Sequence, residues 1–165
     1  MQFILRRAGG CPAQVITSAM STAITAGRER VWRALTTPSE LIRWDDELIA
    51  LLDPVPDYPQ LGQQVRWRYR IGSVEIIVHQ TIQEVQPGER LQSAICRGLF
   101  RFDETYTLAD EVASPDRTRL SLKVVASNST PVVGGEMDRF AVRRLSAELI
   151  DSRLRSVQKW CENHN

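Results

Sequence analysis

Apolar and polar residues alternate without a break along residues 65–71, Val-Arg-Trp-Arg-Tyr-Arg-Ile. A period of two is typical of a strand with one buried and one solvated face. Gly72-Ser73 follows as a two-residue hairpin turn, so a second strand should return from Val74 and pair Arg70 with Glu75 on the solvated face. Directly opposed residues of such a pair share a face. The hairpin therefore predicts one inward set from both strands: Val65, Trp67, Tyr69, Ile71, Val74, Ile76, Val78 and Gln80.

Two further turns extend this register along the chain. Residues 86–89 can make a four-residue turn, which would place Ser93 opposite Ile82. Gly98-Leu99 can make a two-residue turn, which would place Glu104 opposite Ser93. Together with a last strand near residue 120, these pairings extend the predicted inward face to Leu91, Ser93, Ile95, Arg97, Phe100, Phe102, Glu104, Tyr106, Leu120, Leu122 and Val124.

The other segments show a further strand, helical periodicity or turn residues. A first strand is predicted at residues 15–25, and short helices are predicted at about 28–36 and 38–52. An apolar stripe predicts a long C-terminal helix at about 136–161. Three prolines mark residues 53–59 as a loop. A strand, two helices, an antiparallel meander and one long helix make an α+β order.

The junction between the two short helices carries the sharpest local signal. Pro38 cannot continue the first helix and is favoured as the first residue of the second. Thr37 then takes the N-cap position, and Glu40 falls three residues later, which is the spacing of a capping box. The sequence therefore predicts a helix, a stop and a second helix whose start is capped by Thr37 and Glu40.

The segment that contains this junction, residues 28–44, resembles the START-like superfamily, also called SRPBCC. The likeness is to its polyketide cyclase/dehydrase and heat-shock-ATPase-activator-like branches. Residues 85–91, 105–108 and 118–120 agree with it, and the likeness covers residues 15 to 162. It is informative about the fold rather than about a reaction, because the superfamily shares a cavity and not one catalytic motif.

The resemblance implies a helix-grip fold, in which a curved antiparallel sheet wraps around a long C-terminal helix and two short helices follow the first strand. Such a fold usually encloses a cavity. We accordingly expect a single START-like domain over residues 14–162, preceded by a disordered tail at residues 1–13. The same fold would place Trp44 and the three carboxylates of residues 45–47 at the cavity mouth. Three adjacent carboxylates more often form a solvated face than a general base.

The predicted inward face carries polar groups that a plain core would avoid. Arginine and glutamate are rarely buried without partners, and an unpaired buried charge costs several kcal/mol. Either the predicted register is wrong, or these groups meet each other, water or a ligand. Some of them could lie near strand ends and reach solvent, or they could orient a ligand in a mostly apolar pocket. The aromatic residues, for their part, could simply fill a core. The candidate ligand-binding residues are Trp44, Trp67, Tyr69, Gln80, Ser93, Arg97, Phe100, Phe102, Glu104, Tyr106, Met137 and Phe140.

Composition narrows the function classes. The net charge is +1 at pH 7, which gives no global electrostatic case for binding nucleic acid or an anionic membrane. No apolar run approaches the ~20 residues of a membrane span. The three cysteines are far apart and match no zinc spacing, and free thiols favour the reducing cytoplasm. His79 is expected to face outward, and the residue spacings indicate no metal site, cofactor motif or catalytic triad.

Three functions remain open at this point. The leading hypothesis is a protein that binds a small, largely hydrophobic ligand without a cofactor. The second is a cyclase/dehydrase-type enzyme for a polyketide-like or aromatic substrate, in which Arg97 would polarise a carbonyl and Glu104 or Tyr106 would move protons. The third is a protein-interaction module whose surface matters rather than its cavity. The sequence names neither the ligand nor the oligomeric state, and it leaves open whether translation starts at Met1 or Met20.

Overall fold

A computed structural model describes residues 15–97, 100–111, 114–127 and 136–164 of this protein. Within these ranges, the description leaves out the side chains of Phe100, Pro115, Ser127, residues 136–142 and Leu145. The predicted tail at residues 1–13 and the predicted turn at Gly98-Leu99 lie outside the described residues.

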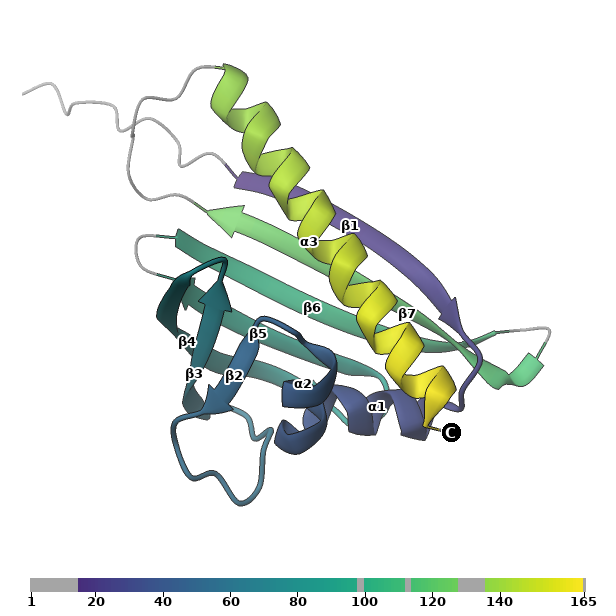
Figure 1. The fold of residues 1–165 in the computed structure, drawn as a ribbon. Coiled ribbons are helices and arrows are strands. Elements are labelled where there is room, and N and C mark those ends of the chain that lie inside the picture. The colour runs from purple at the N-terminus through teal and green to yellow at the C-terminus, as the bar shows by residue number, and fades with distance from the viewer. Residues whose placement is uncertain (1–14, 98–99, 112–113, 128–135, 165) are drawn as a thin grey trace, which may run out of the picture.

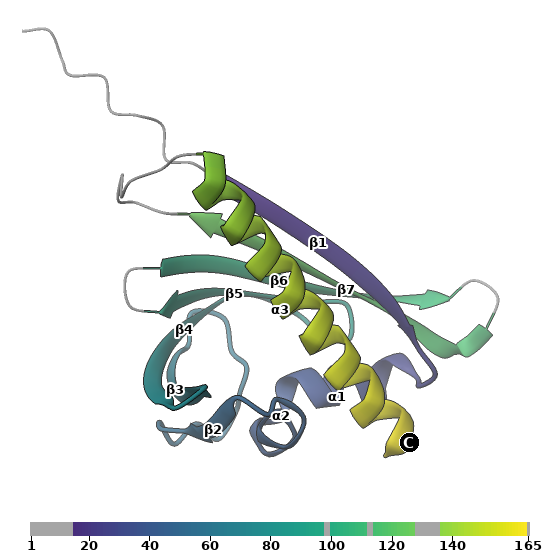
Figure 2. The same cartoon turned by 45° about the horizontal axis from the view of Figure 1, so that its top comes forward.

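The described chain forms one curved antiparallel sheet and three helices (Figure 1), which confirms the predicted helix-grip fold. In chain order the elements are β1 (Val15–Ile24), α1 (Arg28–Thr36), α2 (Pro38–Trp44), β2 (Leu48–Leu51), β3 (Gln64–Ile71), β4 (Val74–Gln86), β5 (Arg90–Arg97), β6 (Phe100–Glu111), β7 (Ser114–Ser127) and α3 (Glu136–Asn163). The seven strands lie in the order β1-β7-β6-β5-β4-β3-β2. Figure 2 shows the β2–β4 end of the sheet curling towards the side on which α3 lies.

The β3–β4 hairpin has the predicted register. Trp67 pairs with Val78 and is buried, whereas the outward side chains of the same strand are exposed. Arg70 and Glu75 form the predicted cross-strand ion pair, at 2.9 Å between Nη2 and Oε1. Val74 faces inward by pairing but is 58% exposed, because it lies at the free end of the hairpin. The inward face of this hairpin is therefore buried along its middle and exposed to solvent at its free end.

The turn between β4 and β5 differs from the prediction by one residue. Gln86 pairs with Arg90, so the turn occupies residues 87–89 rather than 86–89. A bulge between Ile82 and Glu84 compensates for this difference. The predicted pairs from Ile82 onward, which oppose Ser93 to Ile82 and Glu104 to Ser93, are all present.

The second short helix is much shorter than predicted. It was expected over residues 38–52, but α2 ends at Trp44 because Asp45 adopts an extended backbone conformation. Residues 48–51 instead form the edge strand β2 beside β3. The backbone N–H of Leu52 donates to the Arg66 carbonyl at 2.9 Å, which continues this pairing. A short apolar run can form either a helix or a strand, and this one forms a strand because it pairs with the open edge of β3.

The predicted capping box is wrong in its hydrogen bonds. Pro38 does begin α2 after Thr37, but Thr37 makes no side-chain cap. Glu40 instead joins the three helices. Its carboxylate accepts hydrogen bonds from Arg30 Nη1 at 2.7 Å and from Trp160 Nε1 of α3 at 2.7 Å. The residue that sequence spacing assigned to a local cap therefore ties α1 and α2 to α3.

We expect Glu40→Gln to destabilise the protein by about 1–3 kcal/mol at pH 7. Burial acts to raise the pKa of Glu40, but hydrogen bonds from Trp160 and Arg30 outweigh it and lower the pKa below its usual 4.5. The carboxylate therefore adds stability above its unfolded-state pKa, and this stability is lost as the pH falls through the lower folded-state pKa. Urea unfolding should show a smaller difference in unfolding free energy between variant and wild type at pH 3 than at pH 7. Glu89→Gln, at an exposed position, is the control, and an equal loss there would contradict the assignment.

The apolar core consists of one large cluster and one small cluster. α3 packs against β1 and β7, where Ile24, Leu120, Ile150 and Val157 are fully buried. A smaller cluster of Leu48, Val65 and Trp67 lies at the β2–β3 end. In the described part of the chain, no helix is long and apolar enough to cross a membrane. The candidate site borders both clusters, because members of each line it.

Candidate functional site

A cavity of about 470 Å³ lies between the inward face of the sheet, the α2–β2 segment and α3. Its volume is within the range of small-molecule sites in proteins. Most of its lining is apolar or aromatic, with polar groups at separated points. The lining residues are Leu35, Leu41, Trp44, Asp45, Glu47, Leu48, Tyr58, Trp67, Tyr69, Val78, Gln80, Leu91, Ser93, Ile95, Arg97, Phe102, Glu104, Tyr106, Val124, Ala126, Ser146, Leu149 and Arg153.

The structure brings most of the sequence-predicted site residues to this one cavity. They come from α2, β3, β4, β5 and β6, and nine line it: Trp44, Trp67, Tyr69, Gln80, Ser93, Arg97, Phe102, Glu104 and Tyr106. The side chains of Phe100, Met137 and Phe140 lie outside the described residues. That any of the twelve contacts a ligand remains a prediction.

One group of polar side chains in the cavity wall forms hydrogen bonds among its own members. Gln80 accepts hydrogen bonds at Oε1 from Trp67 Nε1 at 2.7 Å and from the Tyr58 hydroxyl at 3.1 Å. Its Nε2 donates to Ser93 Oγ at 3.0 Å. Tyr58 and Trp67 also meet edge to face, with ring centroids 5.6 Å apart. Gln80 therefore fixes the aromatic wall, and its amide does not require a ligand for satisfaction.

A second polar group is a buried ion pair between the sheet and α3. Arg153 Nη1 donates to Glu104 Oε2 at 2.8 Å, and these side chains are 19% and 7% exposed. Arg153 Nη2 lies 3.8 Å from Asp45 Oδ2 and 3.5 Å from the Tyr69 hydroxyl. Glu104, which the sequence placed on the inward face without a counter-ion, thus receives one from α3.

The pKa shifts of Arg153 and of the two lining tyrosines Tyr69 and Tyr106 keep the arginine charged and the phenols neutral. Burial acts to lower the pKa of Arg153, but attraction to Glu104 and other nearby groups raises it well above its usual value. Burial also raises the pKa of Tyr69 and of Tyr106 above the ordinary value of 10. Both phenols are therefore neutral at physiological pH, and neither can act as a general base there.

Arg97 differs from the other charged lining residues. It ends β5 on the inward face, opposite Phe100, and it is half-buried. Its Nε is buried and has no hydrogen-bond partner among the side chains and backbone that the structure describes. Strand ends are where a side chain could reach solvent, but this nitrogen does not.

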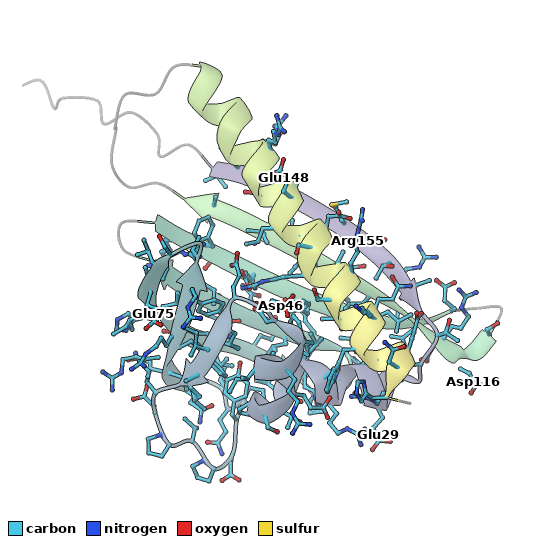
Figure 3. The ribbon with its side chains drawn as sticks, viewed as in Figure 1. Glu29, Asp46, Glu75, Asp116, Glu148 and Arg155 are labelled. Atoms are coloured by element: carbon cyan, nitrogen blue, oxygen red, sulfur yellow. The ribbon has the colours of Figure 1, made fainter. Side chains whose placement is uncertain are left out.

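An acidic hollow of about 300 Å³ adjoins the cavity between the α2–β2 segment and α3. Five residues line both: Trp44, Asp45, Glu47, Leu149 and Arg153. The hollow adds Asp46, Glu148, Ser152 and Ser156. Figure 3 shows Asp46 beside α2 and Glu148 on α3. The prediction of a solvated acidic face at residues 45–47 is wrong for Asp45, which is 9% exposed because it ends α2 and faces Arg153.

Sequence reasoning expected α3 to contribute Met137 and Phe140, but it missed three other α3 residues of the lining and Tyr58 of the proline-rich loop. Ser146, Leu149 and Arg153 follow each other at helical spacing and share one face of α3. The available signal was Arg153, an arginine near the apolar stripe of a helix that packs on the sheet face where Glu104 has no counter-ion. Tyr58 carried no such signal, since it lies in a loop whose path only the structure gives.

Comparison with known proteins identifies the kind of fold that holds this cavity. Residues 15–162 match a family described as polyketide cyclase / dehydrase and lipid transport. No curated protein gives a significant match. A START superfamily protein from Mycobacterium smegmatis has a TM-score of 0.72 at 14% identity, over 90% of this chain and 99% of that one.

Two further solved structures agree with this result. A protein from Thermus thermophilus has a TM-score of 0.68 at 19% identity, over 91% of this chain and 99% of its own. A Staphylococcus aureus protein of unknown function has a TM-score of 0.69 at 9% identity, over 90% of this chain and 96% of its own. At such identities the likeness shows the fold alone.

Proposed function

Because this chain belongs to the START-like family of polyketide cyclases, dehydrases and lipid transport proteins, we propose that it binds a small, largely hydrophobic molecule in the cavity between its sheet and α3. The observation that carries the proposal is the cavity of about 470 Å³ itself, walled by Trp67, Phe102 and Tyr106. Aromatic side chains offer large apolar contact areas to a ligand. The satisfied amide of Gln80 holds part of this wall in place without a ligand.

The size of the cavity supports binding over simple packing. A void left in a protein core costs on the order of 24 cal/mol per Å³ of lost packing. A cavity of about 470 Å³ likewise leaves apolar wall atoms without packing partners. An apolar molecule in the cavity would recover part of that loss, and stabilisation by ligand is therefore the property to measure.

We expect apolar compounds to raise the melting temperature of the purified protein. At a free concentration one hundred times Kd, linkage adds about 2.7 kcal/mol, or about 5–10 °C for a domain of this size. Differential scanning fluorimetry with fatty acids and polycyclic aromatics measures the shift, and native mass spectrometry detects any co-purified ligand. Ala126→Phe, which fills the cavity from β7, should reduce the shift. Ala109→Phe, on the exposed face of β6, should leave it unchanged.

The opposite result would favour a different class of function. If no compound stabilises the wild type and no adduct is found, the cavity is not a binding site under these conditions. The interaction-module hypothesis would then be the better account of the protein.

A cytoplasmic location is part of our proposal, since Cys96 and Cys161 are free thiols and such thiols persist in reducing compartments.

A cyclase/dehydrase-type reaction is the second candidate, and Glu104 is the observation that favours it. Its carboxylate lines the cavity and is oriented by Arg153. Since Tyr106 remains protonated, Glu104 is the better candidate for accepting a proton. A bound compound recovered chemically altered from the wild type, and unaltered from Glu104→Gln, would support catalysis. Recovery unaltered from both supports binding alone.

A further inference from the structure

We infer that the cavity selects molecules that carry a carboxylate, and that Arg97 binds this group. The inference rests on the proposed binding function and deepens it, because it names the chemical class of the ligand. It predicts an amphiphile: an apolar or aromatic body against the cavity walls and one anionic group at the end of β5.

The first step is that, apart from the exposed Glu47, the other charged and amide groups of the cavity already have partners. Gln80 makes three hydrogen bonds within the wall. Arg153 and Glu104 pair at 2.8 Å, and Asp45 lies 3.8 Å from the same guanidinium. These groups can contact a ligand, but their satisfaction does not depend on one.

The second step is that Arg97 brings an unmet donor to the same cavity. A guanidinium stays charged at any physiological pH. A buried donor without an acceptor is destabilising, and more so when the group is charged. The buried Nε of Arg97 has no acceptor within the described residues, so an acceptor supplied by a ligand would remove this cost.

The third step concerns the surroundings of Arg97. On the same face, the neighbouring cavity residues are Ile95, Phe102 and Ala126, which pair across β5, β6 and β7. These three described neighbours are apolar and do not compete with a ligand for Arg97, and a low-dielectric site strengthens an ion pair. Of the three acidic lining residues, Glu104 is paired with Arg153, and Asp45 and Glu47 lie beside the hollow at the α2–β2 segment. An anion would therefore be held at Arg97 and repelled at the hollow.

The fourth step distinguishes among anions. A guanidinium matches the planar geometry of a carboxylate and can donate two parallel hydrogen bonds to it. A phosphate monoester would bring a charge of about −1.5 to −2. Among the described lining residues, Arg97 is the one cationic side chain that forms no ion pair with an acidic side chain. A singly charged carboxylate therefore matches the available charge.

The test compares each acid with a neutral compound of the same shape. The probes are 2-naphthoic acid with 2-naphthamide, and decanoic acid with 1-decanol, and binding is measured by calorimetry on the full chain. We expect the wild type to bind each acid at least about tenfold more tightly than its neutral partner. Arg97→Met should lose this preference while still binding the neutral compounds. Arg101→Met is the matched control, since Arg101 is an exposed arginine on the outer face of β6, and it should keep the preference.

The outcomes separate this inference from the proposed function. If the wild type binds acids and neutral compounds equally, or if Arg97→Met keeps the preference, the carboxylate assignment is overturned and binding in the cavity stands. If neither kind of compound binds, nor the neutral dye Nile red, the proposed function itself fails. The preference of the wild type is decisive even if Arg97→Met does not fold. In that case Arg97→Lys, which keeps the charge but not the paired donors, should show a reduced preference.

Discussion

Replacing Glu104 by leucine is expected to destabilise the protein by about 3–5 kcal/mol. Glu104 accepts a hydrogen bond from Arg153 at 2.8 Å, and both side chains are largely withdrawn from water. Removing the carboxylate leaves a buried guanidinium whose nearest remaining acidic partner is Asp45, at 3.8 Å. The cost is therefore that of a buried charge left with only this more distant partner, rather than that of one lost hydrogen bond. Urea unfolding followed by tryptophan fluorescence measures it.

The double variant Glu104→Leu/Arg153→Met tests this explanation. Replacing a whole buried pair with apolar side chains is often neutral or stabilising, so the double variant should recover most of the loss. The exposed pair Arg144–Glu148 has the same 2.8 Å separation and is the control. Glu148→Leu should change stability by less than about 1 kcal/mol, because exposed pairs contribute little. A double variant no more stable than Glu104→Leu would show that Arg153 is not the source of the penalty.

The sheet side of the cavity could be predicted because two kinds of signal agreed. Alternation along 65–71 fixed the faces of one strand, and Gly72-Ser73 fixed how the next strand returned. From there each pairing followed from the one before it, as far as Glu104 opposite Ser93. A misplaced turn would normally shift every later residue to the other face. Here the bulge after Ile82 restored the register, which the sequence could not have shown.

The helix side could not be predicted in the same way. The apolar stripe of α3 indicates which face is buried, but not where along the sheet each turn of the helix lies. The pairing of Arg153 with Glu104 depends on that placement, since the two are 49 residues apart in the chain. Likewise, residues 48–51 form a strand because β3 offers an edge, and the local sequence is compatible with either state. Tertiary contacts decided both cases.

Truncating a side chain of the closed core should cost far more than truncating one that borders the cavity. Leu122 is fully buried beneath α3, and Leu122→Ala should destabilise the protein by about 2–5 kcal/mol. Phe102 packs against the same core but also lines the cavity. In a closed core, Phe→Ala would cost about 3–5 kcal/mol. We expect Phe102→Ala to cost less than about 2 kcal/mol, because part of the ring faces space that is already open.

The same pair of variants connects stability with binding. Leu122→Ala lowers the stability of the apo protein but leaves the cavity wall intact, so the increase in melting temperature caused by a bound acid should persist. Phe102→Ala should show the reverse: a small loss of stability and a clear loss of ligand stabilisation, since the ring adjoins both the apolar lining and the end of β5 where Arg97 lies. Urea unfolding and scanning fluorimetry on the two variants give the four values required. The contrary result would be that Phe102→Ala loses as much stability as Leu122→Ala, and that a ligand raises the melting temperature of both variants as much as that of the wild type. The space between the sheet and α3 would then be packed in solution, and the ligand would bind elsewhere.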